Sequence, residues 1–253
     1  MKPTALTLLL ALAISCGAIA ELPDLTGTWA MIQVYPQIAI LPMAGEVPRS
    51  SMVAQFVEIT QSGSVLTMRD TYCFTDVDDG TPLVETVIPE AFMASLVPGP
   101  RTAIFVEQTG SVRFEAATYV EVRGAILDDP LSDPLPMEAS DSRVFDQDGD
   151  GNPGMTVHVT ILGLVEGETY VVQRVSYRLS GTVIDRGRIE GTIEWSDEQV
   201  VLGATNALLE ADTIGLLDPD PAAHRFVMVR VDESWTCETL RDRLDEIIGD
   251  TAS

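Results

Sequence analysis

The chain has 253 residues, of which 45% are apolar, and its 39 acidic residues against 15 basic ones give a formal net charge of −24. A chain of this length and composition can bury a sizeable core. A nucleic-acid partner is excluded, because phosphates would be repelled and no basic stripe is present to neutralise them.

The N-terminus has the features of a secretory signal peptide. Lys2 precedes an apolar stretch over residues 5–14, and small residues at 18–20 precede an acidic residue. The apolar stretch is shorter than the roughly 20 residues of a transmembrane helix, and no later stretch is long enough. We therefore expect residues 1–20 to be removed and the remaining chain, with a formal charge of −25, to be exported in a bacterium to a periplasmic, secreted or cell-surface location.

Cys16 leaves a second interpretation of this segment open. Residues 13–16 (Ala-Ile-Ser-Cys) resemble the cleavage box of bacterial lipoproteins, in which the cysteine is kept and lipidated. Such boxes usually begin with Leu, where this one has Ala13. The alternative is a lipoprotein anchored through Cys16.

From residue 29 onward, alternation of apolar and polar residues between turn dipeptides predicts half-buried antiparallel strands. We expect turns at 62–63, 109–110 and 166–167, and short helical turns at 89–96 and 205–211. The expected strands are 29–35, 53–59, 65–68, 104–106, 112–114, 155–161, 170–177, 181–190, 191–195 and 226–231. Residues 21–253 are thus predicted to form one all-β domain of about 8–10 strands, an antiparallel β-barrel or else a two-sheet sandwich, because either arrangement hides strand edges.

The C-terminal region carries one predicted helix and one predicted disulfide. Leu240, Leu244 and residues 247–248 fall on one face of a helix over about 237–248. Cys73 and Cys237 are the two cysteines beyond residue 16, and cysteines of an exported chain usually pair. The link is worth on the order of 4 to 5 kcal/mol in the chain-entropy model.

A long stretch rich in Asp and Pro, residues 124–154, ends in the most specific motif of the chain. Asp146, Asp148 and Asp150 alternate with other residues and are followed by Gly151 and Asn152. Calcium takes six to eight oxygen ligands, and a D-x-D-x-D-G turn folds three carboxylates around one point. We expect these three aspartates and Asn152 to bind Ca²⁺.

The motif resembles the loops of EF-hands, of integrin-type FG-GAP repeats and of thrombospondin type 3 repeats, and it departs from each. Where an EF-hand has a bidentate Glu this chain has Val157, and where an FG-GAP loop ends in Asp it has Gly154. Thrombospondin repeats come in tandem arrays with cysteines, whereas this chain has one copy.

The missing acidic ligand should weaken the site unless another residue replaces it. The candidates in the same stretch are Asp128, Asp129, Asp133, Glu138 and Asp141. We expect affinity on the order of 10⁻⁵ to 10⁻³ M. At millimolar calcium, a site of about 10⁻⁴ M would stabilise the folded state by about 1.4 kcal/mol.

A second resemblance concerns the fold. Gly27-Thr28-Trp29 opens the first strand, a series of hairpins follows, and Arg230 lies in the last strand. This order is similar to lipocalins, and the resemblance implies that Trp29 packs under Arg230 at one end of a barrel.

Catalytic motifs are missing from the sequence. There is no nucleophile elbow, no H-E-x-x-H and no phosphate-binding glycine loop. His158 alternates with threonines, so we expect it to face solvent or a polar lumen, and His224 follows a turn-rich loop, so we expect it to be exposed.

These observations favour an exported, calcium-stabilised β-domain that acts as a non-enzymatic binding or surface-structural module, with its partner unknown. Two alternatives stay open. One is a lipocalin-like carrier of a small hydrophobic ligand. The other is a secreted hydrolase whose active site borders residues 124–154, with His158 as its base.

Overall fold

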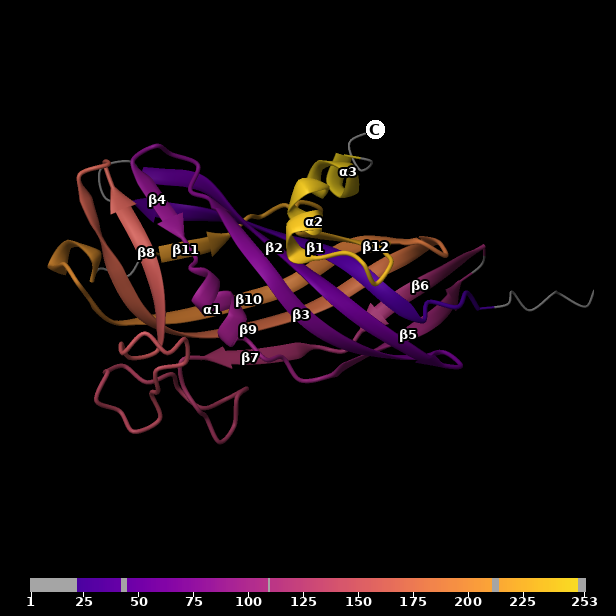
Figure 1. Ribbon diagram of the computed structural model, residues 1–253, viewed down its shortest axis with the longest axis horizontal. Coiled ribbons are helices and arrows are strands. Elements are labelled where there is room, and N and C mark those ends of the chain that lie inside the picture. Colours follow the sequence, from indigo (N-terminus) through magenta and orange to yellow (C-terminus); the bar gives the residue numbers. More distant parts are fainter. Residues whose placement is uncertain (1–21, 42–44, 109, 211–213, 250–253) are drawn as a thin grey trace, which may run out of the picture.

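The computed structural model describes residues 22–41, 45–108, 110–210 and 214–249 (Figure 1). The predicted signal peptide and Cys16 lie outside the described residues. The strands are β1 Gly27–Leu41, β2 Gly45–Ser62, β3 Val65–Asp78, β4 Val84–Val87, β5 Arg101–Gln108, β6 Ser111–Ala116, β7 Tyr119–Arg123, β8 Met155–Ile161, β9 Val165–Asp185, β10 Arg188–Ala204, β11 Ile214–Leu217 and β12 Arg225–Arg230. The helices are α1 Glu90–Ser95, η1 Ala207–Leu209, α2 Cys237–Asp242 and α3 Leu244–Gly249.

Eight strands close the sheet into a ring. In chain order β1, β2, β3, β5, β6, β9, β10 and β12 each pair antiparallel with the next, and β12 pairs back with β1. β7 pairs with β9 next to the segment that pairs with β6, and β11 pairs with β1 next to the segment that pairs with β12. β8 pairs with β9, and β4 pairs with β8, which extends the sheet at that end. The prediction of an antiparallel all-β fold is confirmed, and one closed ring is present rather than two separate sheets.

The interior of the ring changes from apolar to polar along its length. Alternate residues of β1 face inward, beginning with Trp29 and Met31 in the main apolar core and continuing to the buried Gln33 and to Tyr35. On β3 the same alternation passes from two buried apolar side chains to the buried Asp70. Side chains therefore fill one end of the ring, while polar groups occupy its middle.

Arg230 covers the apolar end. Its guanidinium lies 4.9 Å from the centre of the Trp29 ring and donates from Nη2 to the carbonyl of Asp24 at 2.7 Å. Trp29 donates from Nε1 to the carbonyl of Leu25 at 2.9 Å. The expected contact between Trp29 and Arg230 is present, in a pair of strands whose register places the two residues opposite each other.

The C-terminal helices pack on the outside of the ring. Leu240 and Ile247 are buried against Phe74 and Val227. Instead of one helix over 237–248 there are two, because the backbone leaves helical angles at Arg243 (φ −106°, ψ 13°). Among the residues described, no helix combines the length and apolar character needed to cross a membrane.

The predicted disulfide between Cys73 and Cys237 is present, with the two Cα atoms 5.2 Å apart. The register between β2 and β3 shifts at this point, since Ala54 pairs with Phe74 whereas Gln55 pairs with Tyr72. Cys73 is thus the extra residue of a β-bulge. It packs with Phe74 in the outer cluster beneath the helices, which brings it to Cys237.

Two sequence predictions about strand ends were wrong. The turn expected at 166–167 lies at Leu162 and Gly163, with φ of 56° and 62°, and β9 begins before Gly167. Gly167 serves packing instead, because a Cβ there would lie 2.5 Å from Oγ1 of Thr205. The strand expected over 181–190 is interrupted between β9 and β10 by a turn in which Gly187 donates its N–H to Oδ1 of Asp185.

Candidate functional site

The Asp146 side chain organises the turn for which calcium binding was predicted. Its carboxylate accepts backbone N–H groups from Gly149 at 2.7 Å, Asp150 at 3.2 Å and Gly151 at 2.9 Å. Both glycines have positive φ, 76° and 94°, which an L side chain rarely adopts. The glycines therefore allow the chain to wrap around the Asp146 carboxylate.

The turn brings the three predicted carboxylates together. Oxygen atoms of Asp146, Asp148 and Asp150 all lie within 4.8 Å of one another. Asp148 accepts the N–H of Thr156 at 2.8 Å with Oδ2, but its Oδ1 is buried and has no hydrogen-bond partner among the described residues. The hydroxyl of Thr156, a residue only 3% exposed, is likewise buried and unpartnered.

The aspartates differ in how readily they ionise. Burial raises the pKa of Asp148, and the charges of Asp150 and Asp146 raise it further, against the hydrogen bond from Thr156. Burial also opposes ionisation of Asp150, but the proximity of Thr156 and the hydrogen bonds from Asn152 outweigh it, so the pKa of Asp150 is lowered. A cation among the three carboxylates would relieve the repulsion that Asp148 experiences.

These residues fit a small hard cation. Calcium binds oxygen at about 2.3–2.6 Å, so ligands on opposite sides of the ion lie about 5 Å apart, which agrees with the observed group. Asn152 supports Asp150 by donating to its Oδ1 from the backbone at 2.8 Å and to its Oδ2 from the amide at 3.1 Å. The unpartnered Oδ1 of Asp148 is the feature that a bound ion would explain best.

None of the proposed extra ligands joins this group among the described residues. Asp141 forms an ion pair with Arg143 at 2.7 Å, and Asp129 accepts hydrogen bonds from Ser132 and Leu131. The remaining three candidates, Asp128, Asp133 and Glu138, lie elsewhere in the same loop.

The aspartate turn is connected to the ring through Gln147. Its Oε1 accepts the N–H of Gly124 at 2.7 Å, next to the end of β7, and its Nε2 donates to the carbonyl of Ser95 in α1 at 3.4 Å. The loop itself packs on the outer face of β9 and β10, where Leu127 and Leu135 are buried against Val172. The turn thus lies where the long loop, α1 and the sheet meet.

The two histidines lie in different surroundings. His158 is on the solvent-facing side of β8, 3.7 Å from Glu168, in agreement with one of the two placements expected for it. His224 is 5% exposed, so the prediction that it is exposed was wrong. Its Nδ1 accepts the Nε1–H of Trp195 at 2.7 Å, and its Nε2 lies 2.8 Å from the carbonyl oxygen of Asp218.

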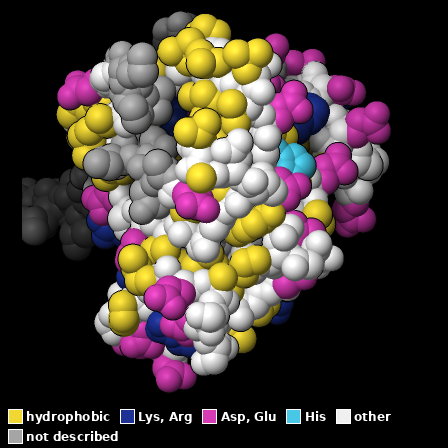
Figure 2. Space-filling model, turned by 90° about the vertical axis from the view of Figure 1, so that its left-hand side faces the viewer, with side chains coloured by type: hydrophobic (Ala, Val, Ile, Leu, Met, Phe, Trp, Pro, Cys, Tyr) yellow, Lys and Arg dark blue, Asp and Glu magenta, His cyan; other side chains and the backbone are white. Residues whose placement is uncertain are grey.

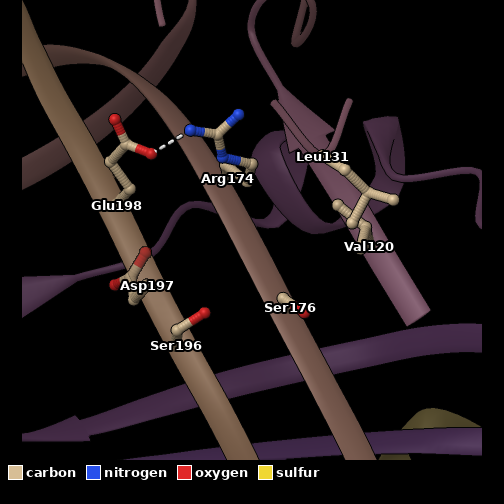
Figure 3. A pocket seen from close by; sticks show the side chains of 7 residues that line it. All are labelled: Val120, Leu131, Arg174, Ser176, Ser196, Asp197 and Glu198. Carbon is tan, nitrogen blue, oxygen red and sulfur yellow. Dashed lines mark hydrogen bonds and ion pairs between the residues drawn. The ribbon is translucent and has the colours of Figure 1, made fainter. Parts of the chain in front are cut away.

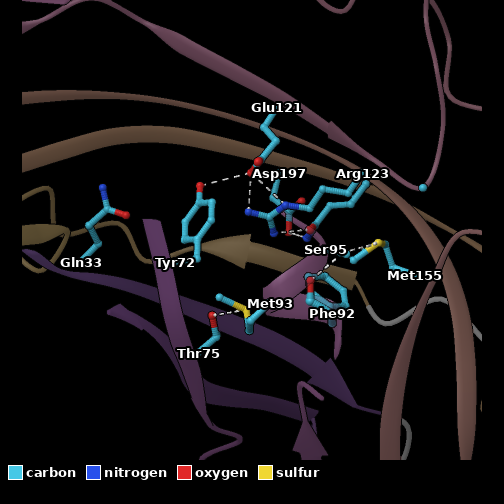
Figure 4. A network of polar contacts seen from close by, with 12 residues as sticks. Gln33, Tyr72, Thr75, Phe92, Met93, Ser95, Glu121, Arg123, Met155 and Asp197 are labelled. Carbon is cyan, nitrogen blue, oxygen red and sulfur yellow. Dashed lines mark hydrogen bonds and ion pairs between the residues drawn. The ribbon is translucent and has the colours of Figure 1, made fainter. Parts of the chain in front are cut away.

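The middle of the ring contains charged side chains that the sequence analysis did not identify (Figure 4). Arg123 donates from Nη2 to Glu121 at 2.7 Å and from Nη1 to Gln173 at 2.8 Å. Tyr72 donates to the same Glu121 carboxylate at 3.2 Å, and Asp197 accepts from Gln173 at 3.1 Å. Deeper inside, a further buried Arg–Asp pair lies between β3 and β5.

The outer surface shows two further features. A groove of about 300 Å³ lies where Leu131 of the long loop faces Arg174 and Glu198 on β9 and β10 (Figure 3). Hydrophobic side chains gather at the end of the molecule that carries the β8–β9 turn (Figure 2). In that turn Leu162 is 59% exposed and Leu164 is 82% exposed.

Comparisons with known proteins add no relative: no family model, no curated protein and no solved structure matches the chain.

Proposed function

We propose that the protein is an exported, non-enzymatic binding module whose ring is stabilised by one Ca²⁺ ion at Asp146, Asp148 and Asp150. The observation that supports it most directly is the buried, unpartnered Oδ1 of Asp148 inside a group of three carboxylates. Export is supported by the signal-peptide pattern of the first 20 residues and by the disulfide, which is typical of oxidising compartments.

In this proposal the ion has a structural role. Through Gln147 the aspartate turn contacts both Gly124 and the carbonyl of Ser95, so an ion that orders the turn also fixes α1 and the end of β7. α1 packs against β3 and β8 and places Phe92 within 5.9 Å of the Arg123 guanidinium. Calcium would therefore support the polar interior from outside the ring.

A lipocalin-like carrier of small hydrophobic molecules is the second candidate. The contact between Trp29 and Arg230 and the chain-order ring favour it. Two observations count against it. Apolar side chains already fill one end of the ring, and the charged side chains in its middle suit a polar ligand better than a hydrophobic one. For this reason we prefer the first proposal.

Thermal unfolding with and without calcium tests the ion site. For the wild type in millimolar Ca²⁺ we expect the melting temperature to rise by about 3–5 °C relative to chelator. Asp148→Asn should lose this rise. In chelator the same variant should melt at or above the wild-type temperature, because it removes one of three repelling charges.

Glu107→Gln is the control, because it changes the charge equally on β5, outside the loop. It should keep the full calcium response. A wild-type melting temperature that is the same in calcium and in chelator would contradict the proposed ion site.

A further inference from the structure

Three neighbouring strands present a grid of side chains to the interior in the middle of the ring. The register between β7, β9 and β10 places these residues in rows across the sheet. Each row has one residue from β7, one from β9 and one from β10, and the three rows are Tyr119–Tyr177–Trp195, Glu121–Val175–Asp197 and Arg123–Gln173–Gln199. Strand centres hold such side chains more precisely than loops do, which suits a binding site.

The charges that face this part of the interior do not balance. Three arginines meet four carboxylates, and three ion pairs form at 3.3, 2.6 and 2.7 Å. The pairs are Arg49–Asp79, Arg101–Asp70 and Arg123–Glu121. Asp197 is the one left without an ion pair of its own among the described residues, and its hydrogen-bond donor is Gln173. The charges of Arg123 and Arg49 act on Asp197 through space without forming an ion pair with it, so its carboxylate can still pair with a further cation.

Aromatic side chains occupy the row next to the unpaired carboxylate. Trp195 lies two residues before Asp197 on the same face of β10, and the Tyr35 ring meets it edge-on at 4.9 Å. Tyr119 and Tyr177 continue the row at 5.6 Å. The faces of such rings attract cations, most strongly where water is partly excluded.

The carboxylate is also reachable. The side chains of Asp197 and Gln199 are exposed although both lie on the inner face of β10, and Trp195 keeps part of its surface exposed. Solvent therefore reaches Asp197, which also lines the groove beside Leu131 and Arg174. The net charge of −24 raises the local concentration of cations around the whole molecule.

We propose that this grid binds a small organic cation, a primary amine or a guanidinium compound, with Asp197 as its counter-ion and the Trp195 ring beside it. Gln173 and Gln199 would accept the remaining N–H donors of the ligand. A divalent metal ion fits less well, because the acidic group able to surround one lies in the outer loop, among the residues described. The inference rests on the binding role proposed above and supplies its ligand class, but it does not depend on calcium.

Calorimetric titration at low ionic strength tests the proposal. The cationic probes are benzylamine and phenylguanidine at neutral pH, and benzyl alcohol and benzoate are their neutral and anionic counterparts. We expect saturable binding of at least one cation, with benzyl alcohol at least about tenfold weaker and benzoate not binding. Asp197→Asn should weaken cation binding by at least about tenfold.

Glu198→Gln is the matched control, since Glu198 is the next residue of β10 but lies on the opposite face of the strand, where it pairs with Arg174. It should bind the cations as the wild type does. Equal affinity for benzylamine and benzyl alcohol would overturn the proposal with no variant needed. So would unchanged affinity of Asp197→Asn, or the absence of saturation by either cation up to about 10 mM.

Each titration is run in calcium and in chelator. If neither cation binds in calcium or in chelator while calcium still raises the melting temperature, the ligand class is rejected and the proposed ion site is retained. Binding of the cation without any calcium effect would reject the ion site alone.

Discussion

Asp70 and Arg101 form the most buried ion pair among the described residues. Their side chains are 0% and 2% exposed, and the guanidinium meets the carboxylate through Nε at 2.6 Å and Nη2 at 3.1 Å. Nη1 of Arg101 is buried and has no hydrogen-bond partner in the part of the chain that the structure describes. Removing two charges from water costs about as much as their attraction returns, so the pair matters less for its net strength than for the damage done when one partner is lost.

We expect Arg101→Met to lower the free energy of unfolding by about 3–5 kcal/mol, because it leaves the Asp70 carboxylate buried and uncompensated. Urea unfolding measures the loss. The double variant Arg101→Met with Asp70→Leu removes both charges and should recover most of it. A single variant that costs less than about 1 kcal/mol would show that water already reaches Asp70.

The disulfide joins two elements that are far apart in the sequence, β3 and α2, because its cysteines are separated by 164 positions. The helices also contact the sheet through Arg241, which lies 3.8 Å from the centre of the Phe74 ring and pairs with Asp76 at 3.1 Å. The covalent link therefore reinforces an existing contact.

Reduction of the disulfide should lower the free energy of unfolding by up to about 5 kcal/mol, since it releases a long loop in the unfolded chain. Urea midpoints with and without reductant measure it. Cys73→Ser combined with Cys237→Ser should match the reduced wild type and no longer respond to reductant. A reductant effect that persists in the double variant could not come from this bond.

At the scale of strands, the sequence predicts the long, alternating elements well and the short ones poorly. The predicted strands 29–35, 53–59 and 170–177 lie within β1, β2 and β9, and 226–231 covers most of β12, because the inner faces there are apolar over several residues. The predicted strand 65–68 is only the start of β3, whose inner face turns polar at Asp70. β4, β7 and β11 were missed. Each has only four or five residues, and each is held by a partner strand distant in sequence, so local pattern carries little information about it.

Prediction of the candidate sites also depended on how close together in sequence their residues lie. Local spacing alone identified the aspartate turn, since Asp146, Asp148 and Asp150 meet within a few residues of chain. The inward charges come from separate strands and were not recognised. A usable signal existed on β3, where Asp70 shares the alternation of Leu66 and Met68 and so must face the core.

Over the whole molecule, acidic residues far outnumber basic ones. Surface ion pairs such as Arg178 with Glu194 contribute little each, whereas 39 acidic residues against 15 basic ones repel across the entire surface. Repulsion should therefore dominate the response of the fold to salt.

In chelator, we expect the melting temperature to rise by several degrees between about 10 mM and about 1 M sodium chloride, because the screening length falls from about 30 Å to about 3 Å. Differential scanning calorimetry measures the change. A melting temperature that falls with salt would mean that ion pairs, not repulsion, dominate the electrostatics of the molecule.

The pairing of Trp29 with Arg230 has a consequence for the order in which the protein folds. The edge of β1 that receives β12 stays unpaired until its partners are made, 191 positions later for Val34 with Arg225 and 201 positions later for Trp29 with Arg230, and the apolar end of the ring is uncovered for the same time. Contacts so distant in sequence form slowly. A chain that stops before β12 would carry an open strand edge beside exposed Trp29, the combination from which intermolecular aggregation starts.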